Sequence, residues 1–101
     1  MLLDEFNWKK EVLQSAEPVL VDFWASWCMP CQAMSPAIEA LGRDFKVCKV
    51  NVDTNRELGA LYGAPPIPAL LIFKNGQVVA RRLGVTPEAI LRAEMEEWGK
   101  K

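Results

Sequence analysis

The sequence of 101 residues contains no histidine and only three cysteines. Without histidine, Ser–His and Cys–His nucleophile pairs are excluded, and a zinc site would have to consist of cysteine and carboxylate alone. Three cysteines are too few, and odd in number, for the disulfide framework of a small secreted domain. Most hydrolase functions are therefore excluded, and if the sequence is the complete precursor we expect a cytoplasmic protein.

An excess of charge of one sign and long hydrophobic runs are also absent. Twelve basic and thirteen acidic residues give a formal net charge of −1, whereas a nucleic-acid partner normally requires a basic excess on one face. The uncharged stretch between Leu58 and Phe73 contains two glycines and three prolines, which excludes a membrane-spanning helix there. The first residues lack the pattern of a secretory signal. We therefore expect no nucleic-acid or membrane partner. We also expect a monomer.

The length and the strand pattern predict one small domain. A chain of this size has room for a single hydrophobic core, so residues 1–101 should form one domain. Residues 19–24 are nearly all apolar, as expected for a strand buried on both sides of a parallel sheet. Residues 46–52 predict a second strand. Residues 69–73 and 77–83 predict two more, which Asn75-Gly76 joins in a two-residue hairpin.

Helices are predicted between these strands. We expect one from Asn7 to about Gln14, one ending near Gly42, a short one between Asn55 and Gly63, and a last one beginning at Thr86-Pro87, with an inner face of Ile90, Leu91, Met95 and Trp98. This order predicts an α/β fold with a central mixed sheet of four to five strands and helices on both faces. Such sheets place their chemistry at the carboxyl ends of the parallel strands.

The first predicted strand end is followed by Trp27-Cys28-Met29-Pro30-Cys31. Two cysteines three apart at a helix start can form a disulfide, and the first sulfur would face unpaired backbone N–H groups and the positive end of the helix dipole. Cysteines in such motifs have pKa values of about 3.5–7.5, compared with about 8.5 for an ordinary cysteine. We predict that Cys28 is the exposed nucleophilic thiolate, that Cys31 resolves the mixed disulfide, and that Pro30 fixes the geometry of the first turn.

Other interpretations of the two cysteines compete with redox chemistry. Cys-x-x-Cys is also half of a zinc or iron–sulfur site, but a closed tetrahedral site needs four ligands and only Cys48 remains as another thiolate. A purely structural disulfide would close too short a loop to stabilise the fold much. A binding or assembly module with incidental thiols is the second functional hypothesis. We expect Cys48 itself to be a small buried hydrophobe, with regulatory oxidation as the alternative.

Four ordered phrases resemble the thioredoxin family, and its reducing rather than its oxidising members. They are residues 21–31 (VDFWASWCMPC), 49–53 (KVNVD), 67–68 (IP) and 73–76 (FKNG). The likeness extends from about residue 7 to residue 98. It implies a thioredoxin-like fold and a protein-disulfide reductase, a redox carrier of electron transport and cell redox homeostasis. It further implies no bound cofactor besides the Cys28–Cys31 disulfide, disulfide-containing protein substrates, and a flavoprotein reductase that draws on NADPH as electron donor.

Two charged residues match family positions in the predicted sheet. Asp22 resembles the buried carboxylate that lies beneath the second cysteine and assists its proton transfers. Burial in an apolar strand should raise its pKa towards neutrality, where a general base is most useful, and an aspartate with access to water is the alternative. Lys49 resembles the lysine near that carboxylate, with a solvated strand lysine as the alternative.

The predicted substrate-binding residues also follow from the resemblance. Pro68 resembles the family's cis-proline opposite the disulfide, a trans proline in a loop being the alternative. Ile67 would then offer its backbone N–H and C=O to an extended substrate segment. The remaining residues of this apolar surface are Trp27, Met29, Gly84 and Val85, of which Val85 could be an ordinary exposed residue.

Three positions depart from the family pattern. We expect them to affect the redox potential and the choice of partners rather than the chemistry itself. Met29 replaces the usual glycine between the first cysteine and the proline, Pro66 replaces a small residue, and Ala69 replaces a common threonine. Because Met29 is uncharged, it lacks the stabilisation of the thiolate that a histidine gives in the oxidising relatives. We therefore predict a reducing protein.

Overall fold

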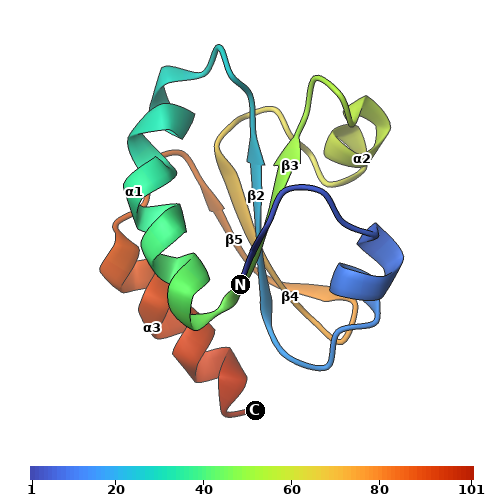
Figure 1. Ribbon diagram of the computed structural model, residues 1–101, viewed down its shortest axis with the longest axis vertical. Coiled ribbons are helices and arrows are strands. Elements are labelled where there is room, and N and C mark those ends of the chain that lie inside the picture. Colours follow the sequence, from blue (N-terminus) through green and yellow to red (C-terminus); the bar gives the residue numbers. More distant parts are fainter.

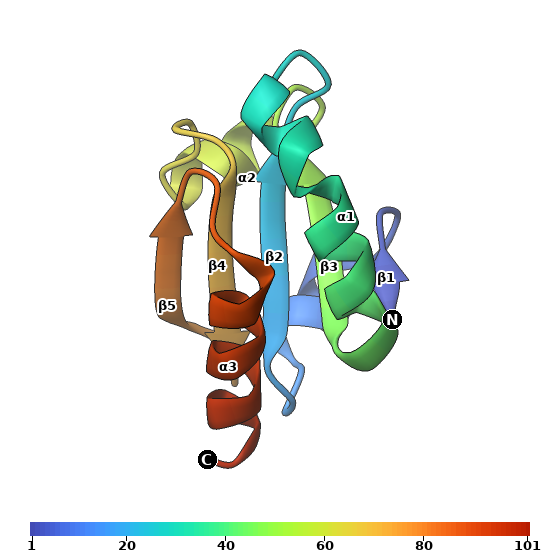
Figure 2. The ribbon, with the colours of Figure 1, turned by 90° about the vertical axis from the view of Figure 1, so that its left-hand side faces the viewer.

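A mixed five-stranded sheet forms the centre of the structure, a computed structural model that describes residues 1–101. The strand order is β1-β3-β2-β4-β5, as Figure 2 shows. The first three strands run parallel to one another, whereas β4 is antiparallel to β2 and β5 is antiparallel to β4. The strands are β1 (Leu2–Leu3), β2 (Val19–Trp24), β3 (Lys46–Asn51), β4 (Ala69–Lys74) and β5 (Gln77–Leu83). The sequence-based prediction of a mixed sheet of four to five strands is confirmed.

Strand β2 occupies the middle of the sheet because both of its faces are apolar. Successive side chains of a strand point to opposite faces, and Val21 and Phe23 belong to one buried cluster while Leu20 belongs to the other. The predicted span of this strand agrees with the structure at both ends. Its carboxyl end at Trp24 therefore leads directly from the core into the Cys-x-x-Cys segment.

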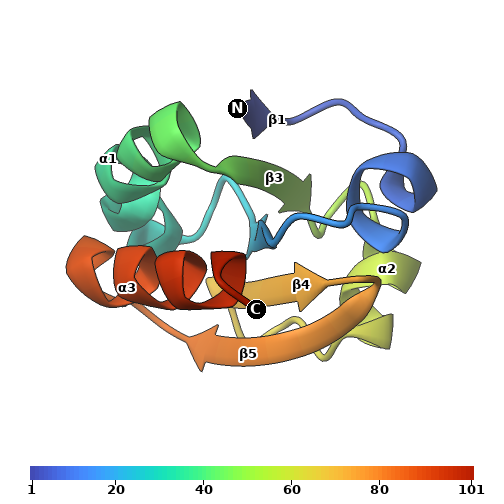
Figure 3. The same ribbon diagram turned by 90° about the horizontal axis from the view of Figure 1, so that it is seen from below.

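Helices cover both faces of the sheet, as predicted. In Figure 3, α1 (Met29–Asp44) and α3 (Glu88–Gly99) lie on one face, and the π-helical turn η1 (Lys9–Leu13) and α2 (Arg56–Leu61) lie towards the other. Leu91 of α3 packs with Met34 and Ile38 of α1 in one buried cluster. The unit β2-α1-β3 is a crossover between parallel strands.

The hairpin between β4 and β5 forms where it was expected. Asn75 and Gly76 have φ values of 53° and 79°, as a two-residue turn between right-twisted strands requires. The turn leaves β4 buried and β5 as a largely exposed edge strand.

Several expectations about element ends and faces were wrong. The helix expected to end near Gly42 continues to Asp44. A Cβ at Gly42 would lie 2.9 Å from the Leu2 Cβ, so this glycine allows the close approach of β1 rather than ending the helix. The short strand β1 was not predicted, since two residues show no periodicity. Ile90, expected on the inner face of α3, is 40% exposed because Leu91 and Met95 fill that face.

None of the helices has the length and the apolar sequence that crossing a membrane would require.

Candidate active site

The two cysteines lie where the carboxyl end of β2 meets the first turn of α1. The loop that joins these two elements is at the top of Figure 1. A disulfide bond joins Cys28 and Cys31, whose Cα atoms are 5.2 Å apart. Cys28 is the N-cap of α1, and its Sγ accepts a hydrogen bond from the Cys31 N–H at 3.2 Å. Pro30 lies in the first turn, where its missing N–H leaves no helical bond unmade. This sulfur therefore occupies the position in which a helix stabilises a negative charge.

Cys28 is not exposed in this disulfide-bonded state, contrary to the sequence-based expectation. Only 4% of its surface is exposed. The reason is the loop before β4, since the Ile67 carbonyl oxygen lies 3.8 Å from the Cys28 Sγ. The residues on either side of Cys28 are open to solvent, because Trp27 is 65% exposed and Met29 is 78% exposed. The disulfide is thus recessed within an apolar, accessible rim.

Asp22 is a buried carboxylate on β2, as predicted. It is 3% exposed, and its Oδ1 has no hydrogen-bond partner. Desolvation raises the pKa of Asp22 to about 6, and the positive charge of Lys49 partly opposes this rise. Lys49 stands beside Asp22 in the register between β2 and β3, with its Nζ 4.6 Å from the centre of the Trp24 ring. The arrangement provides a carboxylate that can hold or release a proton near neutral pH.

The loop that carries Ile67 and Pro68 lies against the disulfide. The Ile67–Pro68 peptide bond is cis, as the resemblance implies. The Pro68 carbonyl accepts a hydrogen bond from the Gly84 N–H at 2.8 Å, which joins this loop to the end of β5. Val85 follows and is exposed. The structure thus places the Ile67 carbonyl against Cys28 and joins the Pro68 carbonyl to Gly84.

Asp53 is a site residue to which the sequence analysis gave no role. Its Oδ2 accepts a hydrogen bond from the Trp27 Nε1 at 2.9 Å, which fixes the exposed indole next to Cys28. Asp53 follows the carboxyl end of β3, parallel to β2. Because such ends meet at one edge of a sheet, its position after a predicted strand was a signal that could have identified it.

Comparison with known proteins supports the same assignment for nearly the whole chain. The family model described as thioredoxin matches residues 1–97. A thioredoxin of Porphyra purpurea is 40% identical over 91% of this chain and 90% of its own, and thioredoxin 1 of Nostoc sp. is 43% identical over 90% and 89%. A solved structure of a mutant thioredoxin from Halobacterium salinarum has a TM-score of 0.86 at 31% identity, covering 98% of this chain and 89% of that one. The chain belongs to the thioredoxin family.

Family membership and the Cys28–Cys31 pair make the chain a thiol–disulfide oxidoreductase of the protein-disulfide reductase type. Its redox-active group is the disulfide itself, and its substrates as a thioredoxin-family protein are disulfide-containing proteins. The predicted fold and family are confirmed by the comparisons.

The third cysteine of this thioredoxin-family chain is separate from the redox pair. Cys48 is fully buried in β3, and desolvation raises the pKa of its thiol to about 11. A thiol with so high a pKa carries almost no thiolate at neutral pH. The structure brings no three cysteine, aspartate or glutamate side chains together in a group that could hold a metal ion.

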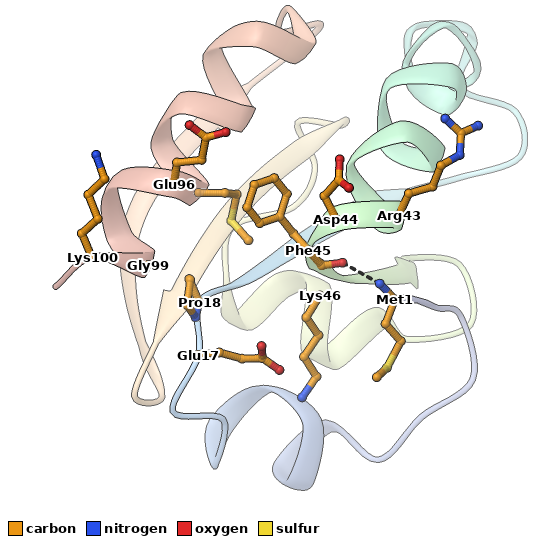
Figure 4. Close-up of a pocket in the computed structure, with 11 residues that line it drawn as sticks. Met1, Glu17, Pro18, Arg43, Asp44, Phe45, Lys46, Glu96, Gly99 and Lys100 are labelled. Atoms are coloured by element: carbon orange, nitrogen blue, oxygen red, sulfur yellow. Dashed lines mark hydrogen bonds between the residues drawn. The ribbon is translucent and has the colours of Figure 1, made fainter.

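The largest cavity, of about 680 Å³ (Figure 4), includes neither Cys28 nor Cys31 among its lining residues. It includes Pro18 and Phe45, which directly precede β2 and β3, whereas Cys28 follows the opposite end of β2. Charges of both signs line it, for example Arg43 and Asp44. The redox site is therefore separate from the largest cavity of the molecule.

Proposed function

We propose that the reduced protein transfers two electrons from Cys28 and Cys31 to a protein disulfide in two exchange steps. The Cys28 thiolate attacks one substrate sulfur, which forms a mixed disulfide and releases the other substrate sulfur as a thiolate. Cys31 then attacks the Cys28 sulfur, which releases the second substrate thiol and forms the Cys28–Cys31 bond. The observation that carries this order is the Cys28 Sγ at the helix N-cap, accepting the Cys31 N–H.

We propose that Asp22 takes up the proton of Cys31 during the second step. A general base works best when its pKa lies near the operating pH, and burial raises the pKa of Asp22 to about 6. The role of Lys49 is to keep this pKa from rising further, since its charge favours the ionised carboxylate. Pro30 keeps the first turn of α1 in the geometry that brings the two sulfurs together.

Substrate binding is assigned to the rim around the disulfide. The backbone of Ile67 pairs with an extended segment of the substrate, a contact that does not depend on its side chains. Trp27, Met29 and Val85 offer exposed apolar surface beside Cys28. Pro68 and Gly84 hold the loop in place, since the Pro68 carbonyl accepts a hydrogen bond from the Gly84 N–H. Broad use of protein substrates follows from this backbone recognition.

The cellular setting that we propose follows from this chemistry and the family. Two sulfurs suffice for the exchange, so the chain needs no bound cofactor. A flavoprotein reductase that draws on NADPH restores the dithiol, in the cytoplasm, as part of electron transport and cell redox homeostasis. We propose one domain, because one sheet includes both β1 at the start of the chain and β5 near its end. We also propose a monomer. With an uncharged Met29, a reducing potential of roughly −300 to −230 mV is expected, around the known value of about −270 mV for thioredoxin itself.

Serine variants of the redox cysteines test the function. Cys28→Ser should abolish the reduction of insulin disulfides by the protein and dithiothreitol. Cys31→Ser should retain the first step and accumulate mixed disulfides in a native cell extract, resolved by gel electrophoresis without reductant. Cys48→Ala is the matched control and should reduce insulin at the wild-type rate. Undiminished reduction by Cys28→Ser, or a potential at or above roughly −180 mV, in the isomerase range, would contradict the proposal.

A further inference from the structure

The loop between α2 and β4 has few hydrogen bonds of its own to hold it in place. Pro65, Pro66 and Pro68 have no backbone N–H, so between residues 65 and 68 only Ile67 can donate one. The Ala64 N–H donates to the Gly59 carbonyl at 2.8 Å. The position of Ile67 over Cys28 therefore depends mainly on how the two ends of the loop are fixed.

Arg81 of β5 fixes the first end of this loop. Its Nη1 donates a hydrogen bond to the Tyr62 carbonyl, and its Nη2 donates one to the Gly63 carbonyl at 3.2 Å. These carbonyls lie at the carboxyl end of α2, where the helix dipole favours a cation. The planar guanidinium can reach both oxygens at once, which the single ammonium of a lysine does less well.

Gly63 leaves the space that the Arg81 side chain needs for this contact. Its φ of +79° belongs to the left-handed region, and a Cβ at this position would lie 2.7 Å from the Arg81 Nη2. The neighbouring Arg82 has a different partner, since its Nε donates to Glu94 of α3 at 2.7 Å. The side chains of these two adjacent arginines thus make contacts on opposite faces of the sheet. Of the two, only Arg81 contacts the loop.

We propose that Arg81 is a positioning residue that sets the place of Ile67 relative to Cys28. Strand β5 and the residue that follows it hold the loop at both ends, through the Arg81 side chain at Tyr62 and Gly63 and through the Gly84 N–H at the Pro68 carbonyl. Loss of the first contact frees the loop to move away from Cys28. This inference rests on the proposed function, because Ile67 matters only as the group that pairs with a protein substrate.

The proposed role of Arg81 predicts different effects of its loss on protein substrates and on small substrates. A protein segment must pair with the Ile67 backbone, whereas a small aromatic disulfide such as Ellman's reagent needs only access to Cys28. Arg81→Met should therefore raise KM for insulin five- to tenfold, up to about 1.4 kcal/mol, with kcat within about twofold of wild type. Its rate with Ellman's reagent should remain unchanged. Arg82→Met removes an equivalent charge from the adjacent residue and should match wild type with both substrates.

Two further readouts keep the inference falsifiable. Arg81→Lys is a milder change because it retains the positive charge. Its KM for insulin should lie between those of Arg81→Met and wild type. Amide hydrogen exchange at Ala64, whose N–H donates to the Gly59 carbonyl at the Arg81 end of the loop, should be faster in Arg81→Met than in Arg82→Met. Equal KM values for the two methionine variants would overturn the role of Arg81, as would an equal loss of rate with both substrates. A wild-type protein that reduces neither substrate would overturn the proposed function, and the role of Arg81 with it.

Discussion

Replacement of Asp22 by asparagine should make the stability of the protein less dependent on pH. Asp22 is 3% exposed, one of its oxygens has no hydrogen-bond partner, and burial raises its pKa from 3.8 to about 6. A shift of about two units corresponds to about 3 kcal/mol. The native state therefore carries this penalty whenever Asp22 is ionised, and the Asp22→Asn variant does not.

The sign follows from the number of protons bound in each state. Between about pH 4 and pH 6 the folded protein holds the Asp22 proton while the unfolded chain releases it, so this residue lowers the free energy of unfolding as pH rises. Below about pH 4 both states are protonated and there is no penalty; above about pH 6 the penalty is complete. The free energy of unfolding of Asp22→Asn minus that of wild type should thus increase by about 3 kcal/mol from about pH 3.5 to about pH 7.5.

Urea denaturation of the oxidised proteins at these two pH values measures this change. Any effect of the amide that does not depend on pH cancels in the comparison. Asp4→Asn, a change of the same type at an exposed position, should show a change below about 0.5 kcal/mol, as surface substitutions usually do. If Asp22→Asn behaves in the same way as Asp4→Asn, the argument from burial is refuted.

Three further substitutions test other parts of the structure. Lys49→Met should raise the pKa of Asp22 above about 6, because the positive charge favours the carboxylate; a carboxyl ¹³C titration by NMR that shows a fall would contradict this electrostatic role. Cys48→Ser should lower the free energy of unfolding by about 1–3 kcal/mol, because it buries a hydroxyl in an apolar core, with unchanged insulin reduction; a loss of reduction would connect Cys48 to the redox chemistry. Gly63→Ala should destabilise the protein by about 1–2 kcal/mol, because its φ is +79°; an unchanged melting temperature would argue against strain at this position.

Patterns local in the sequence predicted the centre of the fold. Residues 19–24 are apolar at nearly every position, so a central strand was the one arrangement that buries both faces. Asn75-Gly76 supplied the positive φ angles that a two-residue hairpin needs. The burial of Asp22 followed from its apolar neighbours in the same strand. Each of these features depends on residues close together in the chain.

Features that depend on contacts between distant segments were not predictable in the same way. Strand β1 forms only because Leu2 and Leu3 pair with Val47 and Cys48. The low exposure of Cys28 results from the Ile67 loop, 39 residues away. The hydrogen bonds of Arg81 to Tyr62 and Gly63 likewise cross from β5 to the end of α2. An isolated arginine in an edge strand gives no sign of such a partner.

Alkylation of the reduced protein tests most directly whether Cys28 is the attacking sulfur. The protein would be treated with iodoacetamide at neutral pH, and modification of each cysteine would be followed over time by mass spectrometry of its peptides. Because only the Cys28 sulfur lies at the helix N-cap and accepts the Cys31 N–H, it should react at least about tenfold faster than Cys31, and buried Cys48 should react only on unfolding. Reaction of Cys31 or Cys48 at the rate of Cys28 would contradict the account.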